Sequence, residues 1–237
     1  MDYTLSKKRM RYDKIRRGVF LSRPNRFVAF VELDGTRTAV HVKNTGRCRE
    51  LLVPGATVII SESDNPARKY RYDLVAVYKG SLLINMDSQA PNPVFEEWLR
   101  TRIDPRNTTI HREFVHGDSR FDFMIEYGDE RILVEVKGVT LENEGVCMFP
   151  DAPTERGAKH LRGLIRSLSE GYKACIAFVI QMGGIRCFVP NRQTDPVFSE
   201  ELVRAHEAGV DVICLECRVE EDGIRIDGEI PFDLGHS

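Results

Sequence analysis

The chain has 237 residues, of which 42% are apolar and 30% are charged, and its formal net charge is −2. This length allows one large domain or two small ones, and the composition is that of an ordinary globular protein. The longest apolar run, Ala174 to Ile180, is far too short to cross a membrane, and the basic residues near the N-terminus are not followed by the apolar core of a signal peptide. We therefore expect a cytoplasmic protein with no membrane association.

Charge is distributed unevenly along the chain. Residues 1–89 contain 17 Lys and Arg against 9 Asp and Glu, a balance of +8, whereas residues 90–237 contain 17 against 27, a balance of −10. Such asymmetry between halves indicates contact with nucleic acid on the basic side. We predict two domains, residues 1–89 and 90–237, with nucleic-acid binding in the first.

The first domain has the pattern of a small β-barrel. Residues 19–33 alternate well enough to form one long strand, with a bend at Pro24-Asn25, and Asp34-Gly35 turns the chain into a second strand. The further predicted strands are residues 57–61, 72–78 and 82–86. Five short strands in about ninety residues are typical of an OB-type barrel.

OB barrels commonly bind single strands by combining a basic groove with aromatic platforms. The loop of residues 61–71 supplies cations on both sides of Tyr70, which we predict as the stacking residue, and we assign Phe30 and Val31 to the barrel core. Our nucleic-acid-binding candidates in this domain are Arg23, Arg26, Asn44, Arg47, Arg68, Lys69 and Tyr70.

The second domain alternates helices and strands. A helix over residues 92–102 precedes a strand over 109–115, a hairpin over 120–138 and a loop of about sixteen residues. A second helix ends at Gly171, and an almost wholly apolar strand follows over residues 173–180, which suits burial on both faces of a mixed sheet. The predicted order of elements is αβββαβ.

The hairpin carries the most informative residues. With Gly128-Asp129 as a two-residue turn, Asp122 lies opposite Glu135 and Arg120 lies opposite Lys137. The other face carries Phe121 and Phe123 and is buried. Polar residues two apart on a strand are often only a solvated face. Here, however, two carboxylates backed by two cations on a partly covered face indicate a site for a metal ion and an anion.

This arrangement, with Asp on the second strand and Glu-x-Lys on the third, resembles the core of the PD-(D/E)XK nuclease superfamily. Six segments spread over nearly the whole chain are informative together: Asn44-Thr45-Gly46, Ser63-Asp64-Asn65, Arg68-Lys69-Tyr70, Arg120-x-Asp122-Phe123-Met124, Glu135-Val136-Lys137-x-Val139-Thr140-Leu141 and Phe149-Pro150-Asp151-Ala152-x-Thr154-Glu155-Arg156-Gly157-x-Lys159-His160-Leu161. In these segments the chain resembles the sugar fermentation stimulation protein (SfsA) family. The resemblance implies an N-terminal OB-like domain, a C-terminal nuclease-like domain and DNA binding.

We expect Asp122 and Glu135 to hold Mg²⁺ or Mn²⁺, since hard divalent ions prefer carboxylate oxygens. The carbonyl of Val136 is a predicted further ligand. Glu97, on the preceding helix, either completes the set or is an exposed helical carboxylate. Lys137 is expected to orient the attacking water or to stabilise the phosphate in the transition state.

The second helix of this domain adds predicted substrate contacts. Arg156, Lys159, Arg162 and Arg166 are spaced three and four apart and form a cationic strip, while His160 lies inside the family signature. Our nucleic-acid-binding candidates in this domain are Arg120, Arg156, Lys159, His160 and Arg162. We expect the long loop of residues 139–154 to act as a lid or to position substrate, with Asp151 and Glu155 near the metal.

The leading functional hypothesis is a metal-dependent phosphodiesterase that acts on DNA, with RNA as a further candidate substrate and with low sequence selectivity. The alternative is a non-catalytic DNA-binding regulator of sugar (maltose-type) catabolism genes. A sugar-modifying enzyme is disfavoured, because a glycosidase needs an acid with no cation beside it. Cys214 and Cys217 point to opposite faces of a strand over residues 210–219, so we expect no metal site there and a structural role for all six cysteines.

Overall fold

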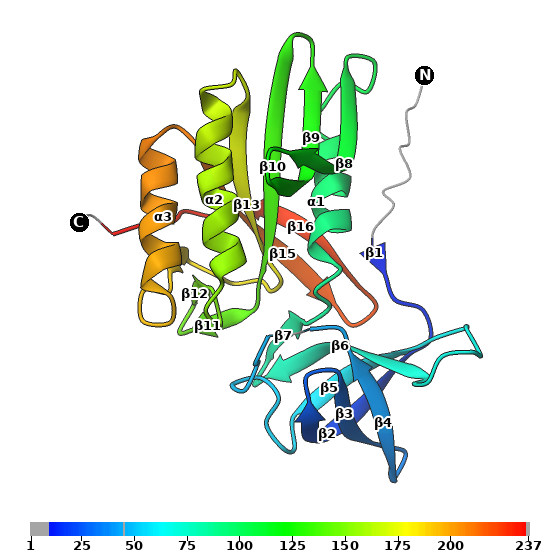
Figure 1. Ribbon diagram of the computed structural model, residues 1–237. Helices are drawn as coiled ribbons and strands as arrows, with labels where there is room; N and C mark the ends of the chain where they lie inside the picture. The colour runs from blue at the N-terminus through cyan, green and yellow to red at the C-terminus, as the bar shows by residue number, and fades with distance from the viewer. Residues whose placement is uncertain (1–9, 45, 236–237) are drawn as a thin grey trace.

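The computed structural model describes residues 10–44 and 46–235. It consists of a closed β-barrel and a larger α/β unit that pack against each other (Figure 1). In the described part of the chain, no helix is long and apolar enough to span a membrane.

The barrel contains the predicted strands, but their connections differ in one place. Its strands are β2 (Ile15–Asn25), β3 (Val28–Leu33), β4 (Thr36–Val42), β5 (Thr57–Glu62), β6 (Tyr72–Lys79) and β7 (Leu82–Asn85). They are ordered β4-β3-β2-β5-β6-β7, and a parallel pairing of β4 with β6 closes the first five into an OB-like barrel. The predicted single strand over residues 19–33 is wrong: Asn25 pairs with Val28, so β2 and β3 form a hairpin that turns after Pro24-Asn25.

The α/β unit is built on a seven-stranded mixed sheet in the order β1-β16-β15-β13-β10-β9-β8. Its strands are β1 (Met10–Arg11), β8 (Thr108–His116), β9 (Ser119–Tyr127), β10 (Glu130–Val139), β13 (Lys173–Ile180), β15 (Asp211–Glu220) and β16 (Gly223–Glu229). Only β10, β13 and β15 run parallel to one another, and the remaining pairs are antiparallel. The predicted order αβββαβ and the mixed sheet are confirmed.

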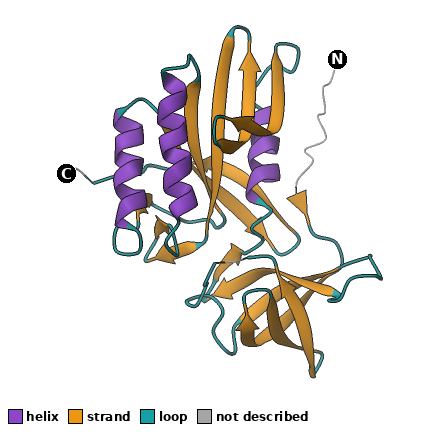
Figure 2. Ribbon diagram, in the orientation of Figure 1, coloured by secondary structure: helices purple, strands orange, loops and turns teal. Residues whose placement is uncertain are grey.

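Helices cover both faces of this sheet (Figure 2). Helix α1 (Pro91–Arg100) packs on one face through Val94 and Phe95, whereas α2 (Glu155–Leu168) and α3 (Pro196–Glu207) pack side by side on the other. Cys214 and Cys217 belong to the apolar clusters on opposite faces, as predicted. Every described cysteine is a free thiol.

The predicted lid loop over residues 139–154 is instead largely structured. It contains the hairpin of β11 (Leu141–Asn143) and β12 (Val146–Phe149), and β12 pairs in parallel with β14 (Cys187–Pro190) in a small separate sheet. Since the backbone groups of the hairpin are bonded within this sheet, only residues 150–154 remain as an irregular connection to α2.

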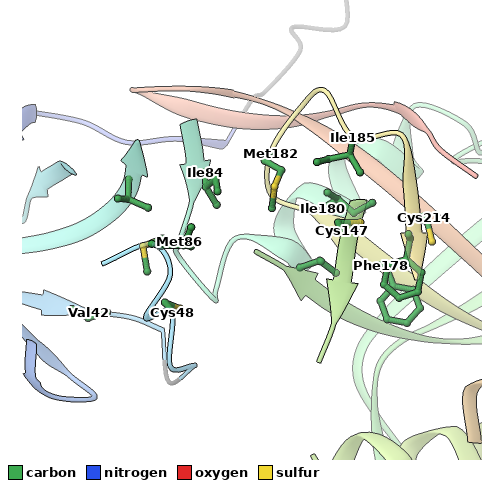
Figure 3. Close-up of a cluster of buried hydrophobic side chains, with 14 of the residues drawn as sticks. Val42, Cys48, Ile84, Met86, Cys147, Phe178, Ile180, Met182, Ile185 and Cys214 are labelled. Carbon is green, nitrogen blue, oxygen red and sulfur yellow. The ribbon is translucent and has the colours of Figure 1, made fainter. Parts of the chain in front are cut away.

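A continuous core joins the barrel to the α/β unit. Ile84 and Met86 from the barrel belong to the same buried cluster as Ile180 and Met182 from the end of β13 (Figure 3). The backbone N–H of Asn85 donates to the Gln181 carbonyl at 2.9 Å. The first strand also crosses this joint, because Met10 pairs with Ile224 in the larger sheet and so lies outside the barrel domain to which we assigned it.

One buried carboxylate organises the barrel side of this joint. Asp73 is 6% exposed and accepts two hydrogen bonds from Arg68, at 2.6 and 2.7 Å, and one from His41. Lys43 Nζ lies 3.2 Å from the same carboxylate. Burial favours the neutral acid, but the Arg68 hydrogen bonds and the charge of Lys43 outweigh it and lower the pKa of Asp73. The Arg68 guanidinium is therefore already paired with Asp73, although part of its side chain reaches solvent, and this pairing competes with the phosphate contact that we predicted.

We predict that Asp73→Asn lowers the free energy of unfolding by about 2–3 kcal/mol. Breaking a fully buried ion pair costs about 3–5 kcal/mol, and the cost is smaller here because Arg68 and Lys43 reach solvent. The pKa of Asp73 is lowered in the folded state, so its contribution is complete above the ordinary pKa of 3.8 and is lost as the pH falls through the lower folded value. Urea unfolding at several pH values measures the difference. The matched control is Asp104→Asn, which removes a surface ion pair with Arg106 and should leave the urea midpoint nearly unchanged.

Candidate functional site

The hairpin of β9 and β10 has the predicted register, with Tyr127 opposite Glu130 and Phe123 opposite Val134. The pairing ends at Phe123 and Val134, and the strands then separate around Asp122. The neighbouring strand is irregular at the same level, because the β8–β9 pairing skips Glu113, which has a positive φ of 54°. The sheet therefore opens where the first carboxylate lies.

Asp122 fills this opening with its own side chain. One carboxylate oxygen accepts the Val136 backbone N–H at 2.8 Å, and the other accepts the side-chain amide of Asn92 from α1 at 2.8 Å. Phe121 does not share the face of Phe123 as predicted: it packs with Met124 on the α2 side, because the strand is irregular at Asp122.

Glu135 lies beside Asp122 and is 2% exposed. Its Oε1 accepts a hydrogen bond from Lys137 Nζ at 2.5 Å and a second from His160 Nδ1 on α2. Its Oε2 is buried and has no hydrogen-bond partner among the described residues. An orphaned carboxylate oxygen next to a second carboxylate is the kind of position at which a cation binds.

The two carboxylates differ electrostatically. Burial and the neighbouring charge of Glu135 raise the pKa of Asp122, although the Val136 N–H opposes the rise. Burial also opposes ionisation of Glu135, but the hydrogen bond from His160 and the charge of Lys137 outweigh it and lower the pKa of that carboxyl. The pair thus combines one carboxylate held in its charged form with one whose charge is costly without a further cation.

His160 has a role that we did not predict. It is 5% exposed and lies against Phe121, with ring centroids 6.0 Å apart, so it is not available to nucleic acid. Its Nε2 accepts from Arg156 Nε at 3.3 Å, which leaves Nδ1 to carry the proton bonded to Glu135. The signal in the sequence is its place in the family signature, since spacing alone gives no link to Glu135.

Two predicted members of the carboxylate site lie elsewhere. Arg120 is not opposite Lys137, because the strands have separated there; it is exposed and forms an ion pair with Glu113 at 3.0 Å. Glu97 accepts the Met10 backbone N–H at 3.1 Å, at the β1 edge of the sheet. Asn92, one turn earlier on α1, is the helix residue that reaches Asp122.

The predicted cationic strip on α2 is largely neutralised. Lys159 and Arg166 both bind Asp118, and Arg162 binds Glu201. Arg156 is exposed and has no carboxylate partner among the described residues, so it is the member of the strip that remains able to meet an anion.

The barrel candidates fall into two groups. Arg23 and Asn44 bind backbone carbonyls and stabilise the loop of residues 44–47, of which residue 45 lies outside the described part of the chain. The side chains of Arg26, Arg47 and Lys69 are exposed, and Lys69 lies over the ring of Tyr70 at 5.4 Å. Phe27 is 55% exposed, and Phe30 lies under Arg37 on the outer surface instead of in the predicted core position.

The carboxylates of Asp122 and Glu135 form a small set of oxygen donors that fits a hard divalent cation. The described residues contain no cluster of three or more His, Cys, Asp or Glu side chains arranged to hold a metal. Asp122 and Glu135 supply two carboxylates, including the unpartnered Oε2, and magnesium commonly uses one or two protein carboxylates and completes its shell with water and phosphate oxygens. Asp151 and Glu155 are not brought to this pair: Asp151 accepts the Arg47 backbone N–H, and Glu155 is exposed at the start of α2.

The fold and this site define a two-domain protein: an OB-like barrel followed by a mixed α/β domain that carries a buried carboxylate pair and an adjacent lysine. The family model of the SfsA N-terminal OB domain matches residues 21–86, and the model of the sugar fermentation stimulation protein RE domain matches residues 89–223. The chain belongs to the sugar fermentation stimulation protein (SfsA) family.

Relatives and a solved structure agree with this assignment. The sugar fermentation stimulation protein homologue of Desulfitobacterium hafniense (strain DSM 10664 / DCB-2) is 54% identical over 215 residues, covering 91% of this chain and 94% of that protein. The homologue of Ruminiclostridium cellulolyticum is 50% identical over 226 residues, covering 95% of this chain and 100% of that protein. A structure of Pyrococcus furiosus SfsA, described as a complex with Ca²⁺, matches with a TM-score of 0.86 at 29% identity, covering 94% of this chain and 98% of that one.

We predict that His160→Ala lowers the free energy of unfolding of the metal-free protein by about 1.5–3 kcal/mol, the contribution of a hydrogen bond to a charged group, while Lys137 stays with Glu135. Urea unfolding in the presence of a chelator measures the change. Lys159→Ala on the same helix removes an exposed ion pair and a backbone hydrogen bond, both with Asp118, and should shift the urea midpoint much less. Equal effects of the two substitutions would contradict the buried link between α2 and Glu135.

Proposed function

We propose that this protein binds nucleic acid, with DNA as the main substrate, and hydrolyses its phosphodiester bonds with the help of a divalent cation, Mg²⁺ or Mn²⁺, held by Asp122 and Glu135. The observation that carries the proposal is the buried, unpartnered Oε2 of Glu135 beside Asp122 and Lys137. The Pyrococcus furiosus relative is described in complex with Ca²⁺, which supports a hard cation here, because calcium and magnesium both prefer oxygen ligands.

The bound cation would supply charge neutralisation at the phosphate and a lower pKa for a coordinated water. The residues of the chain prepare the site for this chemistry. Asn92 and the Val136 N–H fix one carboxylate, while His160 fixes the other from α2, on the opposite side of the sheet from α1. The Val136 carbonyl, between Glu135 and Lys137, remains a proposed further ligand.

Lys137 is the catalytic cation in this proposal. Its ammonium group is bonded to Glu135 and is largely buried, so it is held close to the carboxylates without being able to bind a metal itself. With part of the negative charge of Glu135 shared by a metal, the ammonium group of Lys137 would be available to the scissile phosphate. It would there stabilise the charge that develops in the transition state.

A second function, the non-catalytic regulator of sugar (maltose-type) catabolism genes, is favoured by one observation. Lys137 already neutralises Glu135 without a metal and His160 bonds to the same oxygen, so the site is also self-sufficient as a structural cluster. Helices α1, α2 and α3 all pack on sheet faces, so none of these three is presented as a reading helix and any binding would be poorly sequence-selective.

We predict that Asp122→Asn and Glu135→Gln each weaken binding of Mg²⁺, Mn²⁺ and Ca²⁺ by at least about tenfold, since each removes a directly ligating charge. Isothermal titration calorimetry measures the affinities, and circular dichroism checks that the fold is retained. Glu97→Gln is the control: its carboxylate is directed to Met10, so the affinity should not change. A loss of affinity in Glu97→Gln equal to that in the other variants would place the metal elsewhere.

We predict that Lys137→Ala leaves metal affinity within a few-fold of wild type but lowers the single-turnover cleavage rate about a hundredfold or more, because it removes a charge that acts on the transition state. The assay uses labelled single- and double-stranded DNA and RNA in Mg²⁺ or Mn²⁺. If the pure wild-type protein binds metal and DNA but cuts nothing, the regulator function replaces the nuclease. Equal cutting by wild type and Lys137→Ala would indicate a contaminating nuclease.

A further inference from the structure

A wide groove runs between the barrel and the segment that leads into α2. Its barrel wall is formed by β2 and residues 46–54, its other wall is Phe149 to Thr154, and its volume is about 1160 Å³. Pockets for small ligands typically enclose about 300–1,000 Å³, so this groove is better matched to a segment of a polymer.

The barrel wall of the groove is rich in uncompensated positive charge. Arg26, Arg47 and Arg49 line it, are exposed, and have no carboxylate partner among the described residues. Asp151, on the opposite wall, accepts the backbone N–H of Arg47 and not its guanidinium. This distinguishes the groove from α2, where Lys159, Arg162 and Arg166 are all paired. Unpaired guanidinium groups suit phosphates, which they bind in bidentate fashion, and they also stack on bases.

Arg23 fixes the positions of these arginines. Its guanidinium donates to the carbonyl oxygens of Arg26 at 2.7 Å, Asn44 at 2.6 Å, Gly46 at 2.9 Å and Arg47 at 3.0 Å. One side chain therefore ties together the two loops that carry Arg26 and Arg47. Such preorganisation lowers the entropy lost when a ligand binds.

The groove continues toward the carboxylate site. A second, narrow pocket of about 170 Å³ between the domains shares Gly46, Phe149 and Asp151 with the groove, and it is lined at its other end by Gly138 and Thr140. Gly138 directly follows Lys137. The two pockets therefore connect the arginines to Gly138 and Thr140, at the end of β10.

We infer that this groove binds one unpaired strand of nucleic acid, with its phosphates on Arg26, Arg47 and Arg49, and directs it between the domains toward Gly138 at the end of β10. This inference rests on the proposed function for the identity of the ligand and adds that the strand is single. The inter-domain pocket of about 170 Å³ is far smaller than the groove of about 1160 Å³, which favours a single strand over a duplex. OB folds bind single strands over about 4–16 nucleotides with basic grooves of this kind.

The test is fluorescence anisotropy with a labelled single strand of about 16 nucleotides and a hairpin duplex of the same length, in a chelator so that neither is cleaved. We expect the wild-type protein to bind the single strand at least about tenfold more tightly than the duplex. The triple variant Arg26→Gln, Arg47→Gln, Arg49→Gln should weaken single-strand binding at least about tenfold. It should also reduce the slope of log K against log salt by about 2, that is, about 0.7 for each of three phosphate contacts.

The matched control is Arg102→Gln, Arg131→Gln, Arg218→Gln, which removes the same charge from positions outside the groove. It should change the slope by less than about 1, since nonspecific charge acts only at long range. The inference is overturned if both triple variants lose equal affinity, or if duplex binds as tightly as single strand. Thermal unfolding establishes that each variant is folded.

Cleavage assays separate this inference from the proposed catalysis. If the groove variant loses single-strand binding while the wild-type protein cuts no substrate, the groove assignment stands and the catalytic proposal fails. If the wild-type protein and the groove variant cut duplex and single strand equally well, the catalytic proposal stands and the groove assignment fails.

Discussion

The hydrogen bond from the Val136 backbone N–H to the Asp122 carboxylate determines how the rest of the site is arranged. In an uninterrupted hairpin this N–H would bind a carbonyl of β9, and the two strands would leave no space for a side chain between them. Because the pairing stops at Phe123 and Val134, a carboxylate occupies the gap and satisfies the N–H that the strand has released. Glu135 is then held from the opposite side by α2, so the two carboxylates are brought together by separate elements.

The joint between the domains bears on function as directly as the carboxylates do. The buried cluster that includes Met86 and Met182 continues across the joint, and Gln181 bonds to both the side chain and the backbone of Asn85. An interface with these properties behaves as part of a single core and not as a hinge between two bodies that move independently. The groove beside it therefore has two walls at a fixed separation.

Much of the fold follows from local signals in the sequence. Gly128-Asp129 fixes the register of the hairpin, because a two-residue turn leaves no freedom in strand pairing. The same reasoning fails for Arg120, since register can be extrapolated only while the strands remain paired. Pro24-Asn25 is recognisable as an interruption, but a bend and a tight turn have the same residue preferences, and pairing of Asn25 with Val28 depends on closure of the barrel.

The site is less predictable than the fold because its partners come from distant positions. Asp122, Glu135 and Lys137 can be identified from alternation and spacing, which are local. The bond between His160 and Glu135, and the neutralisation of Arg162 by Glu201, join separate elements and leave no periodic trace in the sequence. Charge counts alone therefore overestimate the α2 strip, while nothing in the local sequence of Arg49 separates it from an ordinary surface arginine.

The pairing of Met10 with Ile224 has a consequence for how the protein is made. The barrel strands come from one contiguous stretch, so this domain can close soon after it leaves the ribosome. The outer edge of the larger sheet, by contrast, pairs Met10 with Ile224, and so it cannot be completed until residue 224 has been made. Once β16 has formed, β1 covers part of its outer edge, which would otherwise present unpaired backbone groups to other chains.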